Sequence, residues 1–492
     1  MENMMAATKA VSHFKSAQQE NSPSRLWSVP FIGLVLFIAF YYLSPGDYFP
    51  ILEGAGLNKI VAGLALVSVI WSNLSQGRPW MEFRIEANLL LLFVAVLVVG
   101  IPFSAWPGGS WGVFTESVIK TLLFVLLMTN VITSRSQLRT LVRVIVICAT
   151  IIAFVAVSHY VTGMFDQWGR LIGYGEKEYY NPNDLALGLL TIIPLTFLLL
   201  LEAKSIFLRC AYTGAIALMS LAILASMSRT GMVGLAFLGT AWLLSMARKT
   251  PKKAIIGMVV VMALVATSVA MVPALADRFG SIFDEEKDDL GSRAARLEHM
   301  WDGLAIMAEN PILGVGMGQT PGAVYARHGS SGPHWEQIHN VYLQVGAEGG
   351  IIALALFLAM MISETARLKR AERALMQGPD AEMVKWPRCM RASILTFIVC
   401  ANFSPVAYNW FFYILLGLSG AALKLLAPSN VVEASTVGPS LSPARLRRLM
   451  FQSGGAFSIR PSRRAERSPA APLLARSPSG LRARTSRDGV QE

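Results

Sequence analysis

The stretch HWEQIHNVYLQVGAEGG, residues 334–350, carries two histidines and a glutamate directly before a long apolar run. Such side chains can bind a metal ion or move a proton. A helical zinc site needs two histidines four residues apart, whereas His334 and His339 are five apart, or about 140° around a helix. A regular helix therefore cannot present both to one ion, and only a loop could bring them together. We expect no metal here and keep His339 as a candidate for proton transfer.

A polar stripe continues from this stretch into the apolar run. Glu336, Asn340, Gln344 and Glu348 are spaced four residues apart, so they share one slowly turning face of a helix. Polar side chains at membrane depth usually face the interior of a helix bundle or a water-filled cavity. The stripe either contacts a substrate or serves helix packing, and the sequence leaves both readings open.

Two further segments bring an arginine to the start of an apolar run. SRTG, residues 228–231, holds Arg229 in a turn too short to let it escape far from the bilayer, where an arginine needs a partner. GRLIGYGEKEYYNPNDLA, residues 169–186, carries Arg170 and Asn183. Asn183 contacts a ligand in one reading; in the other, Asn183 or Asp184 caps the next helix.

Residues 292–310, SRAARLEHMWDGLAIMAEN, have the period of an amphipathic helix. Its apolar stripe consists of Leu297, Trp301, Leu304 and Ala308, and its polar face of Glu298, Asp302 and Glu309. Arg293 and Arg296 fall on or beside the apolar side, so they either snorkel over a membrane-lying helix or point towards an anion. The GVGMG that follows comes after a helix rather than a strand, which favours a glycine-rich turn over a nucleotide site.

The elements that must position these residues are membrane helices. The 492-residue chain is 54% hydrophobic and 15% charged, which is typical of a polytopic membrane protein. Apolar runs approach or exceed the roughly 20 residues that span hydrocarbon. They predict an all-α fold of about twelve transmembrane helices, at residues 28–44, 57–73, 87–104, 113–132, 139–162, 184–201, 207–227, 230–247, 254–275, 340–364, 391–404 and 407–426. ANFSPVAYNW either forms a tight turn between the last two or breaks one long segment.

The distribution of positive charge predicts the orientation. Most of the 43 Lys and Arg residues fall on one side of the predicted spans, which the positive-inside rule assigns to the cytoplasm together with both termini. Residues 1–27 are then a cytoplasmic N-tail, 28–428 the membrane domain and 429–492 a disordered basic tail. A large periplasmic loop, 276–339, separates spans nine and ten and contains the amphipathic helix. The net charge of +12 thus reflects topology, and no nucleic acid is expected as a partner.

The segment RLEHMWDGLAIMAENPILGVGMG, followed by HNVYLQVGAEGGIIALALFL, resembles the signature region of the O-antigen ligase and polymerase superfamily. The upstream MSRTG and NPNDLA motifs fit the same order, and the resemblance covers roughly residues 165–360. Members are membrane glycosyltransferases that use undecaprenyl-diphosphate-linked glycans. The resemblance implies an enzyme of the bacterial inner membrane with a periplasmic active site, no cofactor, and a glycan donor, a glycan or lipid A core acceptor and membrane lipids as partners.

The resemblance also implies residue roles. His339 matches the histidine that opens the tenth span, Arg229 the arginine of the SR turn, Arg296 the loop arginine, and Arg170, more loosely, an arginine before the asparagine motif. The residue types suit a transfer in which a hydroxyl attacks the anomeric carbon of a lipid-diphosphate sugar and inverts it. Arginines give fixed, bidentate positive charge to a diphosphate without a metal. A neutral histidine can accept the proton of the attacking hydroxyl.

One departure concerns the loop arginine. Trp301 stands five rather than four residues after Arg296, which leaves either Arg293 or Arg296 as the functional one. Glu336, about one helical turn before His339, is expected to orient it. Further substrate contacts are expected from Asn183, Asn340 and Gln344.

Three functions compete. A ligase transfers the glycan to a lipid A core, whereas an O-antigen or exopolysaccharide polymerase transfers it to another lipid-linked chain; one dominant outer loop favours the ligase. A lipid-linked sugar flippase or other transporter belongs to a different class and would carry charges along a path through the spans. The charges cluster at the outer face instead, which favours an enzyme over a transporter.

Overall fold

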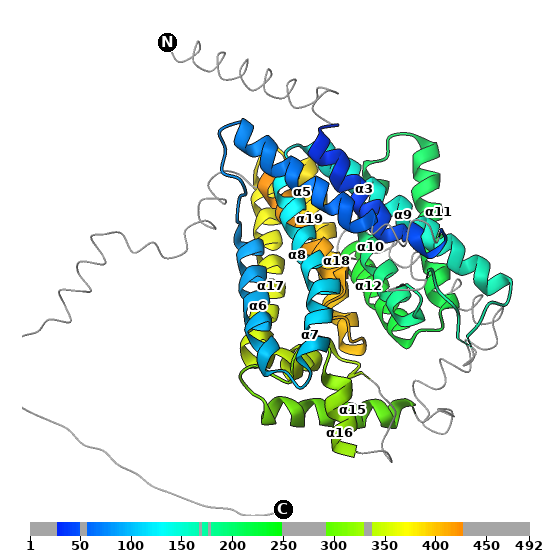
Figure 1. Ribbon diagram of the computed structural model, residues 1–492. Coiled ribbons are helices and arrows are strands. Elements are labelled where there is room, and N and C mark those ends of the chain that lie inside the picture. Colours follow the sequence, from blue (N-terminus) through cyan, green and yellow to red (C-terminus); the bar gives the residue numbers. More distant parts are fainter. Residues whose placement is uncertain are drawn as a thin grey trace, which may run out of the picture. The chain divides into compact units, whose positions relative to one another are not determined.

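The computed structural model describes residues 27–49, 57–166, 170–175, 179–247, 292–328 and 337–426 (Figure 1). The chain divides into two units, Met1–Val437 and Gly438–Glu492, and all described residues belong to the first. The predicted N-tail and C-terminal tail, the predicted span at 254–275, His334 and Glu336 lie outside the described residues.

The described residues are helical, and they form no strand beyond one isolated bridge between Phe165 and Leu171. The helices are α3 (Val29–Leu43), α5 (Leu57–Ser75), α6 (Ile85–Gly100), α7 (Pro107–Val113), α8 (Ile119–Val131), α9 (Arg135–Val161), α10 (Pro182–Glu202), α11 (Ile206–Ala225), α12 (Arg229–Ala247), α15 (Ser292–Glu309), α16 (Thr320–His328), α17 (Val341–Gln377), α18 (Lys385–Cys400) and α19 (Trp410–Leu426). A π-helical turn, Phe114–Val118, joins α7 to α8.

The fold class agrees with the sequence. Among the described residues, 6 helices are long and apolar enough to cross a membrane, and four shorter apolar helices accompany them, so the chain is an all-α polytopic membrane protein. Each predicted span other than 254–275 coincides with a described helix. The ANFSPVAYNW segment is a turn between two helices that pack together, α18 and α19, rather than a break in one helix.

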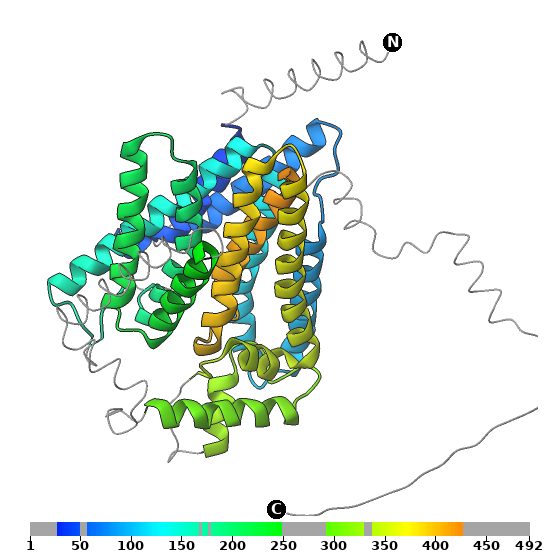
Figure 2. The ribbon, with the colours of Figure 1, turned by 180° about the vertical axis from the view of Figure 1, so that it is seen from behind.

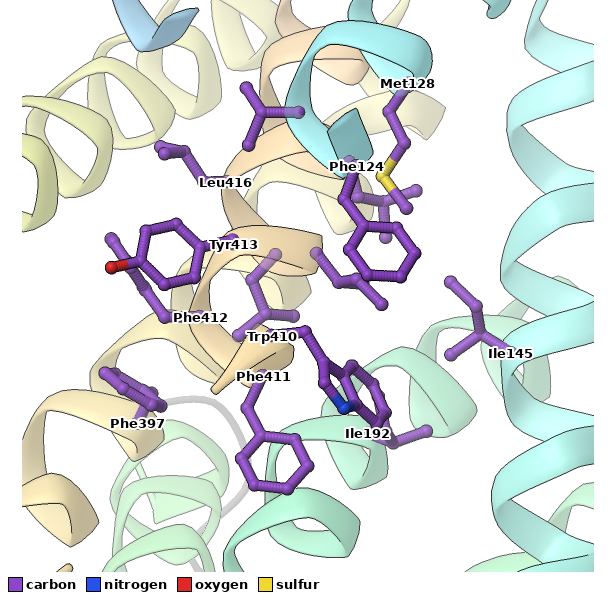
Figure 3. Packing of buried hydrophobic residues seen from close by; sticks show 14 of the residues in the cluster. Phe124, Met128, Ile145, Ile192, Phe397, Trp410, Phe411, Phe412, Tyr413 and Leu416 are labelled. Atoms are coloured by element: carbon purple, nitrogen blue, oxygen red, sulfur yellow. The ribbon is translucent and has the colours of Figure 1, made fainter. Parts of the chain in front are cut away.

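The core of the described bundle surrounds α19. This helix is apolar on all faces and nearly all its residues are buried, as expected of a helix enclosed by others. Its first residue, Trp410, lies with its ring centroid 4.4 Å from that of Tyr42 and 5.6 Å from that of Tyr179. In the same core, Phe397 stacks on Phe412 (Figure 3). These rings hold the starts of α10 and α19 and the end of α3 together at one end of the bundle.

α17 is broken near its start. Gly350 has a φ of 74°, a conformation open to glycine, and this interrupts the helix. The segment that follows α15 fills the break: Val315 N donates to Ala347 O at 2.8 Å, Gly316 N to Glu348 O at 3.0 Å, and Ile351 N to Pro311 O at 2.8 Å. Backbone groups freed by the break are thereby satisfied, which a segment at membrane depth requires.

Gly316→Ala is expected to lower the free energy of unfolding by about 1–3 kcal/mol or more. Gly316 has a φ of 100°, and a Cβ there would overlap Ser104 and the hydroxyl of Ser110. Thermal unfolding of the purified protein in detergent measures the effect. Gly239→Ala in α12 is the matched control, because no atom lies within 4 Å of its added Cβ and alanine is the better helix former. Equal unfolding temperatures for both variants would contradict the tight packing of the glycine-rich turn.

α15 is the predicted amphipathic helix, and it lies with α16 beyond the ends of α6 and α7 (Figures 1 and 2). Its apolar stripe faces away from the described protein: Leu297 is 55% and Trp301 66% exposed, whereas His299 and Asp302 are buried. Of the predicted polar face, Asp302 is buried with its Oδ2 2.9 Å from His328 Nε2 of α16, whereas Glu298 and Glu309 are exposed. The structure thus contains the predicted helix, and the side that it buries carries His299, Asp302 and Ile306.

Candidate active site

The first turn of α10 positions Asn183. Asn181 is the N-cap, and its side chain accepts from the backbone N–H of Asn183 at 2.9 Å, so the expectation that Asn183 or Asp184 caps this helix was wrong. The buried side chain of Asn183 is therefore free of a capping role. Its Oδ1 accepts instead from the hydroxyl of Ser228 at 2.7 Å.

Ser228 and Arg229 begin α12 beside Asn183. The Ser228 hydroxyl also accepts from the backbone N–H of Gly231 at 3.3 Å, and Gly231 packs closely on Ala186 of α10. Arg229 is half-buried in this first turn. The preceding Met227 has a positive φ of 49°, a strained conformation that such a tight turn between α11 and α12 imposes. The structure thus brings Arg229 and Asn183, from two helices, to one place.

Arg170 reaches the same region from the loop before α10. Its backbone N–H donates to Asp166 Oδ1 at 2.8 Å, and Asp166 N donates back to Arg170 O at 2.8 Å, which closes a tight turn. Burial lowers the pKa of Arg170, while the nearby carboxylates of Asp166 and Asp184 act in the opposite direction. Because Asp184 follows Asn183 directly, this interaction indicates that Arg170 lies in the region of the first turn of α10.

His159 anchors the loop that carries Arg170. This half-buried side chain lies in the last turn of α9, and its Nδ1 is 2.9 Å from both Ile172 O and Gly173 O. Two carbonyl acceptors require a proton on Nδ1. The histidine that the sequence places near the outer end of the fifth span therefore holds the loop in place.

His339 stands immediately before α17. Asn340 is the N-cap of this helix, and its Oδ1 accepts from the backbone N–H groups of Tyr342 and Leu343, each at 3.0 Å. His339 is half-buried and precedes the cap, so it belongs to the segment that enters the helix rather than to the helix itself. This agrees with its predicted place at the entrance of the polar stripe.

The polar stripe behind His339 contacts neighbouring loops. Asn340 Nδ2 donates to Asn402 O at 3.3 Å, and Gln344 Oε1 accepts from Ala407 N at 3.1 Å. Glu348 is 1% exposed and accepts from Gly318 N at 2.8 Å and from the hydroxyl of Thr320. These bonds favour the packing role for the deeper stripe, since each satisfies a buried polar group. They also fix the start of α17 to the loops on either side.

The His339 and Arg229 regions are linked through the end of α18. Cys400 Sγ lies 4.0 Å from Thr230 O in the first turn of α12, and the turn that follows α18 contributes the Asn402 carbonyl bound by Asn340. One connected set of contacts therefore runs from the start of α10, through the start of α12 and the end of α18, to the start of α17.

Three helix N-termini meet at this end of the bundle. α10, α12 and α17 all begin there, and the first turns or caps of these helices carry Asn183, Arg229 and Asn340. A helix N-terminus carries a partial positive charge and exposes backbone N–H donors. Together with Arg170 and Arg229, the arrangement gives a positive potential that suits an anion such as a diphosphate.

α15 packs beside the start of α17. The side chains of Arg293 and Arg296 lie outside the described residues, so their predicted roles stay predictions. The second half of α15 packs against residues around His339: a Cβ on Gly303 would meet Ile338, and Gly346 contacts Met307. Among the described residues, no group of three or more His, Cys, Asp and Glu side chains could hold a metal ion.

Lys120 is a cation that the sequence patterns do not single out. It lies in α8, within an apolar span, with Nζ 5.6 Å from the ring centroid of Tyr41, and Tyr41 in turn contacts Trp410. A lysine inside a membrane span marks functional sites by default, so its position in an apolar run was the available signal.

The comparison with protein families agrees with this geometry. The family model described as O-antigen ligase matches residues 214–358, which include Arg229, α15, the glycine-rich turn and His339. No curated protein matches the chain. The match supports the resemblance of the chain to the O-antigen ligase and polymerase superfamily and an O-antigen ligase or polymerase type of function in a membrane protein.

Proposed function

We propose that the protein is an O-antigen ligase-type glycosyltransferase that moves a glycan from undecaprenyl diphosphate to an acceptor hydroxyl at the periplasmic face of the inner membrane. The observation that carries the proposal is the meeting of three helix N-termini, with Arg229 and Arg170 beside Asn183 and with His339 at the start of α17. A diphosphate needs fixed positive charge, and an attacking hydroxyl needs a base; this end of the bundle offers both.

In the proposed reaction, His339 accepts the proton of the acceptor hydroxyl as its oxygen bonds to the anomeric carbon. The bond between that carbon and the diphosphate oxygen breaks, and undecaprenyl diphosphate leaves with the electron pair. Arg229 and the loop arginine, Arg296 or Arg293, stabilise the charge that develops on the leaving oxygen, and Arg170 assists. Asn183, Asn340, Gln344 and Glu336 contribute to the shape and orientation of the site. A single displacement inverts the anomeric configuration.

The proposal is tested by glycan transfer with the purified protein. Undecaprenyl-diphosphate oligosaccharide serves as donor, and a lipid A core and a second lipid-linked oligosaccharide serve as acceptors in parallel reactions. Transfer to the lipid A core supports the ligase, whereas elongation of the second lipid-linked chain supports the polymerase alternative. Activity should persist in a chelator of divalent cations, and the product should have the inverted anomeric configuration by NMR.

A transport function makes the opposite prediction. A flippase moves a fluorescent lipid-linked sugar between the leaflets of a proteoliposome and forms no new glycosidic bond. Movement of the lipid-linked sugar without transfer to either acceptor would overturn the proposal.

A further inference from the structure

The second half of α17 carries an exposed stripe that changes character along its length. Ile362 is 66% exposed and Ala366 is exposed one turn later; Lys369, Arg370 and Arg373 follow, all of them exposed. Positions three and four residues apart share one helix face. The stripe therefore passes from apolar to basic over two turns, as expected where a helix leaves hydrocarbon and enters the headgroup layer.

These basic residues differ from others nearby in having no acidic partner. Arg367 pairs with Glu86 and Glu364, and Arg388 and Arg391 both pair with Glu372 at 2.8 Å. Within the described part of the chain, no carboxylate pairs with Lys369, Arg370 or Arg373, so their charge is directed outward.

The start of α6 contributes a further arginine at the same level of the bundle as these basic residues. α6 and α17 run antiparallel, because Glu86 pairs with Arg367 while Phe93 lies with its ring centroid 5.8 Å from that of Phe357. Arg84, the residue before α6, is consequently at the level of Lys369 and Arg370. Its Nε is buried and has no hydrogen-bond partner among the described residues.

Two aromatic side chains stand beside Arg84. Trp80 is 52% and Phe83 40% exposed, and their ring centroids are 5.4 Å apart. Exposed tryptophan is typical of the membrane–water interface. Aromatic and basic residues thus occur together where the exposed apolar stripe of α17 ends, as expected at a membrane–water interface.

We propose that this exposed stripe of α17, together with Arg84 at the start of α6, binds an anionic phospholipid at the end of the bundle away from His339. The headgroup phosphate contacts Arg84, Lys369, Arg370 and Arg373, and the acyl chains lie along Ala366 and Ile362. Guanidinium groups bind phosphate in a bidentate manner and account for the arginine-rich composition. The C-terminal segment from residue 429 is itself rich in arginine, so like charge opposes its docking here.

The test is lipid binding to the full-length protein by native mass spectrometry, with phosphatidylglycerol against phosphatidylcholine. Wild type should retain phosphatidylglycerol preferentially, and less of it as salt rises. The triple variant Lys369→Gln, Arg370→Gln, Arg373→Gln should bind it at least about tenfold more weakly. The matched control, Lys59→Gln, Arg143→Gln, Arg209→Gln, removes the same charge from exposed residues elsewhere and should bind as wild type does.

Three results would overturn the proposal: equal binding by the triple variant and wild type, an equal loss in the control, or displacement of the lipid by inorganic phosphate alone. Arg84→Gln gives a second readout and should weaken binding without the other substitutions. The measurement involves no glycan transfer, so it stands or fails separately from the proposed enzymatic function.

Discussion

His339→Ala is expected to reduce glycan transfer by about 10²–10⁴-fold, the usual contribution of a general base. The variant should have a lower turnover rate than wild type but the same thermal stability. His339 is half-buried and precedes the cap of α17, and the capping bonds from Asn340 to Tyr342 and Leu343 do not involve it. Purified variant and wild type are compared with the same donor and acceptor, and their unfolding temperatures are measured alongside.

Two further variants sharpen this result. His339→Gln keeps a polar side chain of similar reach but has no basic nitrogen, so it should be as inactive as the alanine variant. His328→Ala is the matched control, since His328 faces Asp302 between α15 and α16 and has no role in the proposed chemistry. Full activity of His339→Ala would show that the histidine is not the general base, whether the acceptor is a lipid A core or a second lipid-linked oligosaccharide.

The membrane helices were largely predictable because their signal is local. An apolar run of span length forms a helix in a membrane whatever it packs against, since no other structure satisfies its backbone. The start of α12 at Arg229, directly before the predicted span 230–247, follows from the same local reasoning. α17 extends beyond its predicted end, to Gln377, because the helix continues outside hydrocarbon as a charged segment that hydropathy does not detect.

The orientation of α15 was not predictable from its own residues. Periodicity separates an apolar face from a polar face but does not say which one meets the protein. The observed orientation depends in part on α16, whose Arg327 lies with Nε 3.5 Å from Asp302 Oδ1 and with Nη1 2.6 Å from Glu309 Oε1. Such pairings depend on the tertiary arrangement, and a single sequence does not contain it.

Part of the candidate site was likewise predictable from the sequence, and part was not. Residue types and motif order indicated His339, Arg229, Arg170 and Asn183, and the structure connects the segments that carry them. The bond between Asn183 and Ser228 joins residues 45 apart in sequence, and the bond from Gly318 to Glu348 joins residues 30 apart. Contacts of this kind leave no periodic signal, so the packing role of Gln344 and Glu348 became visible only in three dimensions.

Arg367→Ala is expected to destabilise the protein by about 3–5 kcal/mol, the largest stability effect we predict. Arg367 donates through Nη1 to Glu86 and to Glu364 at 2.9 Å, and both carboxylates are essentially inaccessible to solvent. Without the guanidinium, two buried carboxylates face each other with no counter-charge. Unfolding is followed by circular dichroism as denaturant is added to the protein in detergent.

Matched variants separate the charge effect from lost packing. Glu364→Gln leaves the pair between Glu86 and Arg367 intact and removes one of two like charges, so its effect should be much smaller. The combination Glu86→Met, Glu364→Met, Arg367→Met removes all three charges and should recover most of the stability, because an apolar replacement of a buried ion cluster is often neutral or stabilising. If Arg367→Ala unfolded at the same denaturant concentration as wild type, the cluster would not hold α6 to α17. The rigidity of α17 beyond Gly350 would then have to come from its apolar contacts, such as that between Phe357 and Phe93.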